Sequence, residues 1–229
     1  LGATYYGLTN YIISCANVIM PLFAIGMQNT LIKFYSQYKT EQEKSRFLSF
    51  TVLFPFILII PLLLIGILFY DDILFFLSKK NAIVKDYIWL IPFTGLCMAY
   101  FEIFYAWARI HMHSVFGNFI KEVGLRLFSS ILLLGVYYGW LTVEGFVYAT
   151  AGLYFLALLL TMYHAFSVQK PVFQFVIPDN TKEILVYTFY IILSGSIANL
   201  LLDGDKVILN QYMNIENIAF YSVATYIAL

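Results

Sequence analysis

The chain has 229 residues, of which 62% are hydrophobic, 19% are aromatic and only 11% are charged. Soluble globular domains carry about 25% charged residues, so this composition excludes an ordinary soluble domain. Thirteen basic residues balance thirteen acidic ones, and a neutral chain lacks the positive charge of a nucleic-acid-binding surface. Apolar stretches of about 20 residues recur along the chain and predict an all-α, polytopic membrane protein.

Six hydrophobic segments are expected to cross the membrane, and a seventh begins at about residue 216. In chain order, the six are expected at 6–32, 47–70, 87–108, 116–139, 146–167 and 184–208. Pro21 should kink the first of them, because proline lacks an N–H and its ring crowds the preceding turn. Residues 71–85 should form a short interfacial connection on the outer side. The segments 47–70 and 146–167 have apolar centres and are expected to face lipid, whereas the other four should surround a shared polar interior.

The first segment carries polar side chains on one face. Asn10, Ser14 and Asn17 are spaced by four and three residues, which places them on one side of a helix. Such a stripe can hold neighbouring helices together through hydrogen bonds, or it can line a cavity. The sequence leaves both interpretations open.

The fourth segment carries the most costly residue of the chain. Asn118, Glu122 and Arg126 are spaced by four residues and share a helical face. Arg126 lies roughly 15 Å in from Phe116, near the middle of a hydrocarbon core about 30 Å thick. An arginine at that depth costs roughly 2.5 to 3.5 kcal/mol on insertion scales. It therefore predicts either a structural pair with Glu122 or the edge of an anion-binding site.

Three other charged residues flank this one. Glu102 lies roughly 10 Å inside the third segment, and we expect it to pair with Arg109 or Arg126; a proton or cation site is the alternative. Lys121 points about 140° away from Arg126 on a regular helix. Because it also lies near the interface, we expect its long side chain to reach the headgroup layer.

The sixth segment has a polar stripe near its outer end. It includes Asn199, Asp203 and Lys206, with Asp205 beside them. One interpretation is a solvated helix end with an internal ion pair. The other is a gate where two helical bundles meet.

No cofactor or metal site is expected. Cys15 and Cys97 lie inside hydrophobic segments and are interpreted as packing residues, with no disulfide framework. His111 and His113 have no third ligand near them in the sequence, so a metal pair is not predicted.

Basic residues set the expected orientation. Nine lysines and arginines lie in the connections 33–46, 109–126 and 168–183, whereas four lie in the alternate connections. Positively charged connections stay in the cytoplasm, so residue 1 is expected on the outer side. Because the chain has no signal peptide, we expect a further helix ahead of it.

A weak internal repeat suggests how the helices are organised. The stretch 6–12, YGLTNYI, is similar to the stretch 221–227, YSVATYI, 215 residues later. Both open an inward-running helix, which is the pattern of a parallel repeat. We therefore expect residues 1–183 to form most of a first six-helix bundle and residues 184–229 to begin a second. The whole protein should then have at least twelve helices.

Three stretches resemble a known family: LGATYYGLTNYI, PLFAIGMQNTLIKFYSQYKTEQEK and LLLDGDKVILNQYMNIENIAFYSVATYIA. They are similar to oligosaccharide flippases, also described as polysaccharide biosynthesis proteins, of the multidrug/oligosaccharidyl-lipid/polysaccharide exporter superfamily. The resemblance runs from the second helix of such a protein to its eighth. It implies a MATE-like exporter fold, with two six-helix bundles around a central cavity that opens alternately to each side. The first helix and most of the second bundle of the family are absent from this sequence.

The resemblance also implies a function. It implies export of a polyprenyl-pyrophosphate-linked oligosaccharide across the inner membrane of the cell, for surface polysaccharide such as the O-antigen of lipopolysaccharide. The partners would be this substrate and membrane lipids, with no nucleic acid; a coupling cation is an open alternative. The expected substrate path consists of Asn10, Ser14, Asn17, Glu102, Arg109, Asn118, Glu122, Arg126, Asn199, Asp203 and Lys206.

Two other functions remain open from the sequence. A cation-coupled multidrug exporter of the same fold would be expected to carry more acids than cations in its cavity. A membrane enzyme, such as a glycan polymerase or an acyltransferase, needs a catalytic centre, often in a sizeable outer loop. The outer connections of this chain are short, so we expect a protein that is not an enzyme.

Overall fold

The computed structural model describes residues 2–172 and 176–228, and all of its regular elements are helical within those ranges. Residues 173–175, which belong to the expected linker 168–183, lie outside the described residues, as do 1 and 229. The elements are α1 (Ala3–Ala24), α2 (Met27–Phe34), η1 (Tyr35–Gln37), α3 (Glu41–Leu68), α4 (Tyr70–Ser78), η2 (Ala82–Tyr87), α5 (Leu90–Ile110), α6 (Ser114–Phe119), η3 (Ile120–Gly124), α7 (Leu125–Tyr137), α8 (Val143–Val168), α9 (Thr181–Tyr212) and α10 (Ile215–Ala228).

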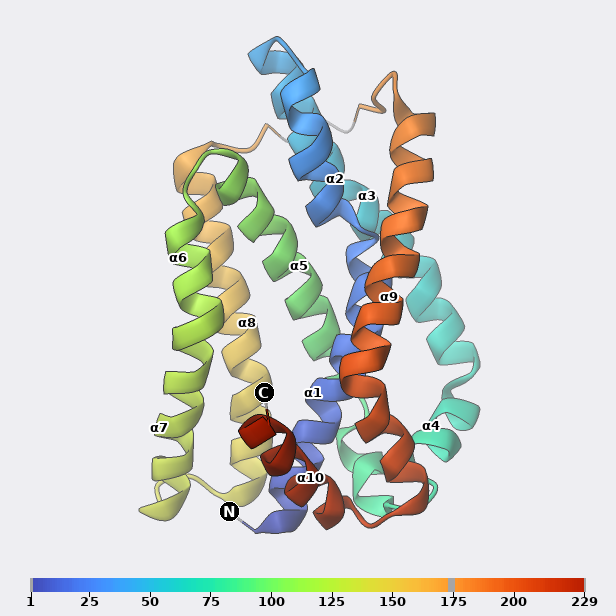
Figure 1. Ribbon diagram of the computed structural model, residues 1–229, viewed down its shortest axis with the longest axis vertical. Coiled ribbons are helices and arrows are strands. Elements are labelled where there is room, and N and C mark those ends of the chain that lie inside the picture. The colour runs from blue at the N-terminus through green and yellow to red at the C-terminus, as the bar shows by residue number, and fades with distance from the viewer. Residues whose placement is uncertain (1, 173–175, 229) are drawn as a thin grey trace.

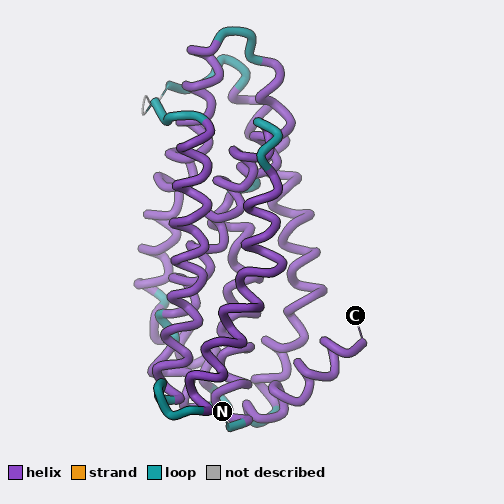
Figure 2. The backbone as a smooth tube through the Cα atoms, turned by 90° about the vertical axis from the view of Figure 1, so that its left-hand side faces the viewer, coloured by secondary structure: helices purple, strands orange, loops and turns teal. Residues whose placement is uncertain are grey.

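The long helices run lengthwise through one elongated bundle (Figures 1 and 2). Figure 1 shows the connections from α2 to α3, from α5 to α6 and from α8 to α9 at its upper end. The N-terminus, α4, the turn between α7 and α8, and the turn between α9 and α10 lie at the lower end. The connections therefore alternate between the two ends as expected. We refer to these as the upper and lower ends, which the predicted orientation makes cytoplasmic and outer.

Five helices in the described part of the chain are long and apolar enough to span a membrane: α1, α3, α5, α8 and α9. The boundaries differ from the expected ones at polar termini. α3 begins at Glu41, six residues before the expected start, because Thr40 and Glu43 form a reciprocal capping box there. α9 extends to Tyr212, four residues beyond the expected end.

The expected first span is broken rather than kinked. α1 continues past Pro21, and the break comes at Ile25 and Gly26, whose φ angles of 50° and 63° are both left-handed. The Ile25 N–H donates to the Pro21 carbonyl and closes the last turn of α1. A Cβ on Gly26 would also lie 2.8 Å from a side-chain carbon of Ile191 on α9. The conformation and the close approach together require glycine at this position.

The expected fourth span is one continuous run with a π-turn inside it. α6 leads into η3, in which the Leu125 N–H donates to the Ile120 carbonyl five residues earlier, and α7 follows. A π-turn places one extra residue in a helical turn, and such turns are frequent at functional sites. It changes which side chains of this segment share a face.

The helices differ in how much of their surface is buried inside the bundle. α5 is the central one: 72% of its most apolar window is buried, against 22% for α3 and 11% for α9. The interior position of the third expected span and the peripheral position of the second are therefore confirmed. α9 was also expected inside, but few of its residues are buried, and it packs mainly through its side facing α1 and α2.

Two large apolar clusters hold the bundle together. The upper cluster is built on the fully buried Trp107, Phe34 and Phe47. The lower cluster joins α1 and the connection around η2 to α10, and it includes Tyr11, Val84 and Ile215. Between membrane helices, side chains of this size stabilise the fold through close van der Waals packing, so these clusters fix the relative positions of the helices.

Candidate functional site

A hollow of about 340 Å³ lies among α1, α5, the α6–α7 segment, α8 and α9. We call it the central hollow. Its polar lining residues are Asn17, Glu102, Lys121, Tyr154, Asn199 and Asp203, and its apolar ones are Met20, Met98, Phe101, Leu125, Ala157 and Leu202. Five separate elements contribute, so the hollow depends on the tertiary packing of the whole bundle.

An ion pair joins two walls of the central hollow. The Lys121 ammonium donates to Glu102 Oε1 across 2.6 Å, with side-chain exposures of 45% and 19%. Glu102 therefore pairs with neither Arg109 nor Arg126, and Lys121 does not reach away from the interior; both expectations were wrong. The π-turn explains this, because an i→i+5 turn moves Lys121 off the position that a regular α-helix gives it.

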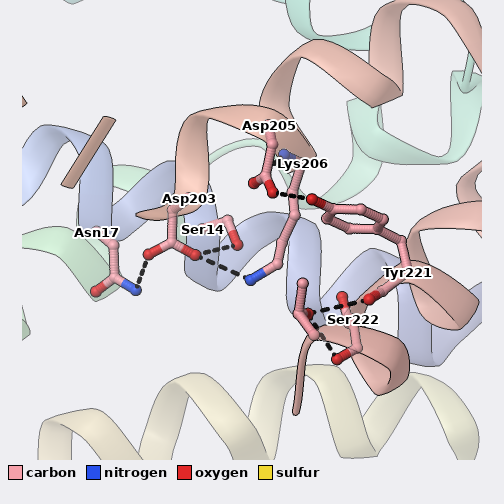
Figure 3. A network of polar contacts seen from close by, with 8 residues as sticks. Ser14, Asn17, Asp203, Asp205, Lys206, Tyr221 and Ser222 are labelled. Atoms are coloured by element: carbon pink, nitrogen blue, oxygen red, sulfur yellow. Dashed lines mark hydrogen bonds and ion pairs between the residues drawn. The ribbon is translucent and has the colours of Figure 1, made fainter. Parts of the chain in front are cut away.

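A second polar group forms the opposite wall, around the carboxylate of Asp203 (Figure 3). Ser14 Oγ donates to Asp203 Oδ1 at 2.8 Å, and Asn17 Nδ2 donates to Oδ2 at 2.9 Å. Lys206 Nζ reaches Oδ1 at 3.1 Å. Asn199 Nδ2 donates to the backbone carbonyl of Asn17 at 2.6 Å. The polar stripes of α1 and α9 thus bind each other, and Asn17, Asn199 and Asp203 also line the hollow.

Asp203 and Lys206 are not a solvated helix end. Their side chains are only 14% and 15% exposed, and α9 continues for nine residues beyond Asp203. Asp205 accepts a hydrogen bond from the Tyr221 hydroxyl on α10 (Figure 3). The ion pair was expected from the sequence, but its nearly enclosed position between α1, α9 and α10 was not.

A second, more open hollow of about 550 Å³ lies nearer the upper end. We call it the upper hollow, and it is lined by Tyr105, Arg109, Ser114, Val115, Asn118, Phe119, Glu122 and Val123. On α5, positions 98, 101 and 102 line the central hollow, and positions 105 and 109 line the upper one. Steps of three and four keep these residues on one face of the helix. The two hollows therefore follow one face of α5 toward the turn between α5 and α6, and we refer to them together as the polar track.

Arg126 lies at the edge of this track. Its Nη2 atom lies 3.3 Å from Glu122 Oε2, and the two side chains are 75% and 51% exposed. The expected pairing with Glu122 is confirmed. Arg126 lines neither hollow, so the cation of the central hollow is Lys121, which sequence reasoning assigned to the headgroup layer.

Asn10 and His111, two residues considered in the sequence, form hydrogen bonds outside the two hollows. Asn10 Nδ2 donates to the Tyr6 carbonyl of its own helix at 2.9 Å, and this residue lines neither hollow. His111 joins elements at the upper end, where its ring meets the Tyr35 hydroxyl at 3.1 Å and the Trp107 carbonyl at 2.9 Å. Within residues 2–172 and 176–228, no three histidine, cysteine or acidic side chains lie close enough together to bind a metal ion.

Comparison with known proteins gives one result beyond the geometry. No curated protein and no solved structure matches the chain. The family model described as polysaccharide biosynthesis protein matches residues 1–229, the whole sequence. Its match agrees with the helical membrane architecture and with the three stretches that resemble this family. The chain therefore belongs to the polysaccharide biosynthesis protein family.

Proposed function

We propose that this chain is part of a flippase that moves a lipid-linked oligosaccharide across the cytoplasmic membrane by alternating access. The observation that carries the proposal is the polar track through a helical membrane bundle of this family. A charged side chain inside such a bundle is costly, and it usually marks a substrate path. The track needs no covalent chemistry, because moving a substrate across a membrane breaks no bond.

The lining of the central hollow suits a glycan. Hydroxyl groups of sugars exchange hydrogen bonds with amides, which Asn17 and Asn199 supply. Phe101 and Tyr154 add aromatic surface, which can pack against the apolar face of a sugar ring. A polar glycan would thus cross the bilayer without contacting the lipid chains.

Lys121 suits the anionic phosphates of a lipid carrier. An ammonium group has three N–H donors, and the structure gives it one acceptor, Glu102. Asp203, by contrast, already accepts three hydrogen bonds, from Ser14, Asn17 and Lys206. Lys121 therefore has donors left for a ligand, and its 45% exposure leaves it accessible from the hollow.

The charge balance favours this substrate over a drug cation. The acids of the central hollow are Glu102 and Asp203, and each has a lysine partner. A cation-coupled drug exporter was expected to show an excess of cavity acids. Paired charges of both signs suit a neutral glycan joined to an anionic phosphate.

The direct test is transport by the purified full-length protein in lipid vesicles. A fluorescent polyprenyl-diphosphate oligosaccharide would be placed in one leaflet, and its movement followed by quenching from outside the vesicles. Lys121→Met should slow movement at least roughly tenfold, because a charged hydrogen bond to phosphate is lost. Lys80→Met, at an exposed lower-end position, should move the lipid at the wild-type rate. Absence of movement by the wild-type protein, or full activity of Lys121→Met, would contradict the proposal.

A further inference from the structure

The lower end of the bundle is closed by an interlock of buried amides that belongs to neither hollow. It joins the connection between α4 and η2 to the turn between α9 and α10, which are far apart in the sequence but meet at the lower end (Figure 1). We propose that Asn81 and Asn210 are an outer latch, which holds this end shut while the polar track is accessible from the upper end.

Asn81 is the centre of the latch. Its Nδ2 donates to Asn210 Oδ1 at 2.8 Å and to the Met213 carbonyl at 3.0 Å. Its Oδ1 accepts from the Ile215 N–H at 2.9 Å, the first residue of α10. Asn81 is 8% exposed and Asn210 is 1% exposed. One side chain therefore holds both the end of α9 and the start of α10.

Asn210 also binds the end of α4. Its Nδ2 donates to the Leu77 carbonyl at 2.8 Å, and the next residue, Gln211, donates to the Phe76 carbonyl at 2.8 Å. Tyr11 on α1 also donates to the Leu77 carbonyl, at 3.3 Å. The carbonyls at the end of α4 are satisfied by side chains of α9 and α1, so separating these segments would leave buried polar groups without partners.

The backbones of α1 and α10 also pack closely beside the latch. A Cβ on Gly7 of α1 would lie 2.1 Å from the Ile215 carbonyl oxygen. Cys15, on the same helix, is 5% exposed and packs in the lower apolar cluster with Val84 and Ile215. Val84 belongs to the η2 side of the latch and Ile215 to the α10 side. Cys15 also lies one turn from Tyr11, whose hydroxyl donates to the Leu77 carbonyl in the latch, so we expect opening at this end to raise the exposure of the Cys15 thiol.

An opened latch is expected when Asn81 is replaced by aspartate. Asn81→Asp keeps the acceptor for the Ile215 N–H, but it loses the amide N–H donors and sets a carboxylate against three oxygens, namely Asn210 Oδ1 and the backbone carbonyls of Asn210 and Met213. The thiol of Cys15 in the full-length protein, with Cys97→Ala and any other cysteines replaced, reports the opening. Its reaction rate with a charged, membrane-impermeant thiol reagent should rise roughly tenfold or more over that of the same background carrying Asn81. Asn217→Asp alters an exposed amide at the same end and should leave the rate unchanged.

A crosslinked variant distinguishes opening at this end from loss of folding. Thr4 Oγ1 on α1 donates to Glu216 Oε1 on α10 at 2.9 Å. In the pair Thr4→Cys/Glu216→Cys, a short bifunctional methanethiosulfonate should bridge the two helices, because each cysteine thiolate forms a disulfide with the reagent and displaces a sulfinate. The bridge should return the Cys15 reaction rate of Asn81→Asp to that of the parent, and reduction should reverse this. If Asn81→Asp does not accumulate, the Thr4→Cys/Glu216→Cys pair can be bridged in a protein that keeps Asn81. The bridge should then stop lipid movement, and reducing the bridge should restore lipid movement.

Two results would overturn the latch. One is an unchanged Cys15 reaction rate in folded Asn81→Asp; the other is undiminished lipid movement by the bridged protein. The role of the latch in transport rests on the proposed function. The Cys15 reaction rate can be measured whether or not the protein moves this lipid. If the vesicles show no lipid movement while Asn81→Asp exposes Cys15, the latch stands and the proposed substrate fails.

Discussion

Lys121 and Glu102 face each other across the central hollow, with 2.6 Å between the ammonium nitrogen and the carboxylate oxygen. They are 19 positions apart and lie on different helices. The pair forms because α6 packs against α5 and brings Lys121 of η3 within reach of Glu102. It neutralises two charges that would otherwise be costly inside a membrane protein.

Glu102→Gln should therefore raise the affinity for an anionic substrate. The change removes the carboxylate that competes for Lys121, so the KM for a polyprenyl-diphosphate oligosaccharide should fall by roughly threefold. The free energy of unfolding should change by less than about 1 kcal/mol, since Lys121 is 45% exposed and solvent screens the pair. The measurements are initial transport rates against substrate concentration and thermal unfolding in detergent. A higher KM would show that Glu102 itself binds the substrate.

Arg126→Ala should impair transport less than Lys121→Met does. Arg126 is 75% exposed and its guanidinium pairs with Glu122, which lines the upper hollow, so we expect a loss of roughly twofold to tenfold. Arg126→Lys should retain more, because charge persists without the bidentate fork. The double variant Arg126→Ala/Glu122→Gln separates a structural pair from a substrate contact. Recovery of both abundance and transport would mean that the pair is only structural.

Gly7→Ala should destabilise the protein by about 1–3 kcal/mol, because the new methyl group overlaps the Ile215 carbonyl oxygen and must push α1 away from α10. Gly152→Ala on α8 is the matched control. Nothing lies within 4 Å of its added Cβ, and alanine favours helix over glycine by about 1 kcal/mol. Thermal unfolding of the two variants in detergent should therefore shift in opposite directions. Equal shifts would mean that α1 and α10 do not pack this closely.

The two ends of the bundle should be accessible from opposite sides of the membrane. Cysteine at Gln42, exposed at the upper end, should react with an impermeant reagent only after the membrane is permeabilised. Cysteine at Lys80, exposed at the lower end, should react in intact cells. Asn81 would be an unsuitable position, because it is buried in the latch. The reverse labelling pattern would invert the orientation predicted from the basic connections.

Much of the architecture follows from composition and periodicity. The apolar segments, their alternating connections and the interior position of the third segment are properties of side chains taken in order. The polar stripes on α1 and α9 were also visible as spacings of three and four, since a helix converts such spacing into a shared face. Ser14, Asn17 and Asp203 accordingly lie together in the structure.

The partners of the charged residues were decided by tertiary structure. The sequence assigned Lys121 to the headgroup layer because a regular helix turns it away from Arg126. One π-turn changes that register, and nothing in the local sequence IKEVG distinguishes it from an α-helical turn. The sequence likewise predicts a kink at Pro21, since proline is the stronger local signal, but the helix breaks at Ile25 and Gly26.

Asn81 shows most clearly the difference between what the sequence predicts and what the tertiary structure decides. In the sequence it is one polar residue in an outer connection, indistinguishable from an exposed one. In the structure it is buried, because the turn after α9 folds onto that connection from 129 residues away. The sequence by itself determined that this is a helical membrane protein with polar helix faces, since periodicity is local. Which charges pair, and which amides are enclosed, depends on contacts between distant segments, and only the tertiary structure decided them.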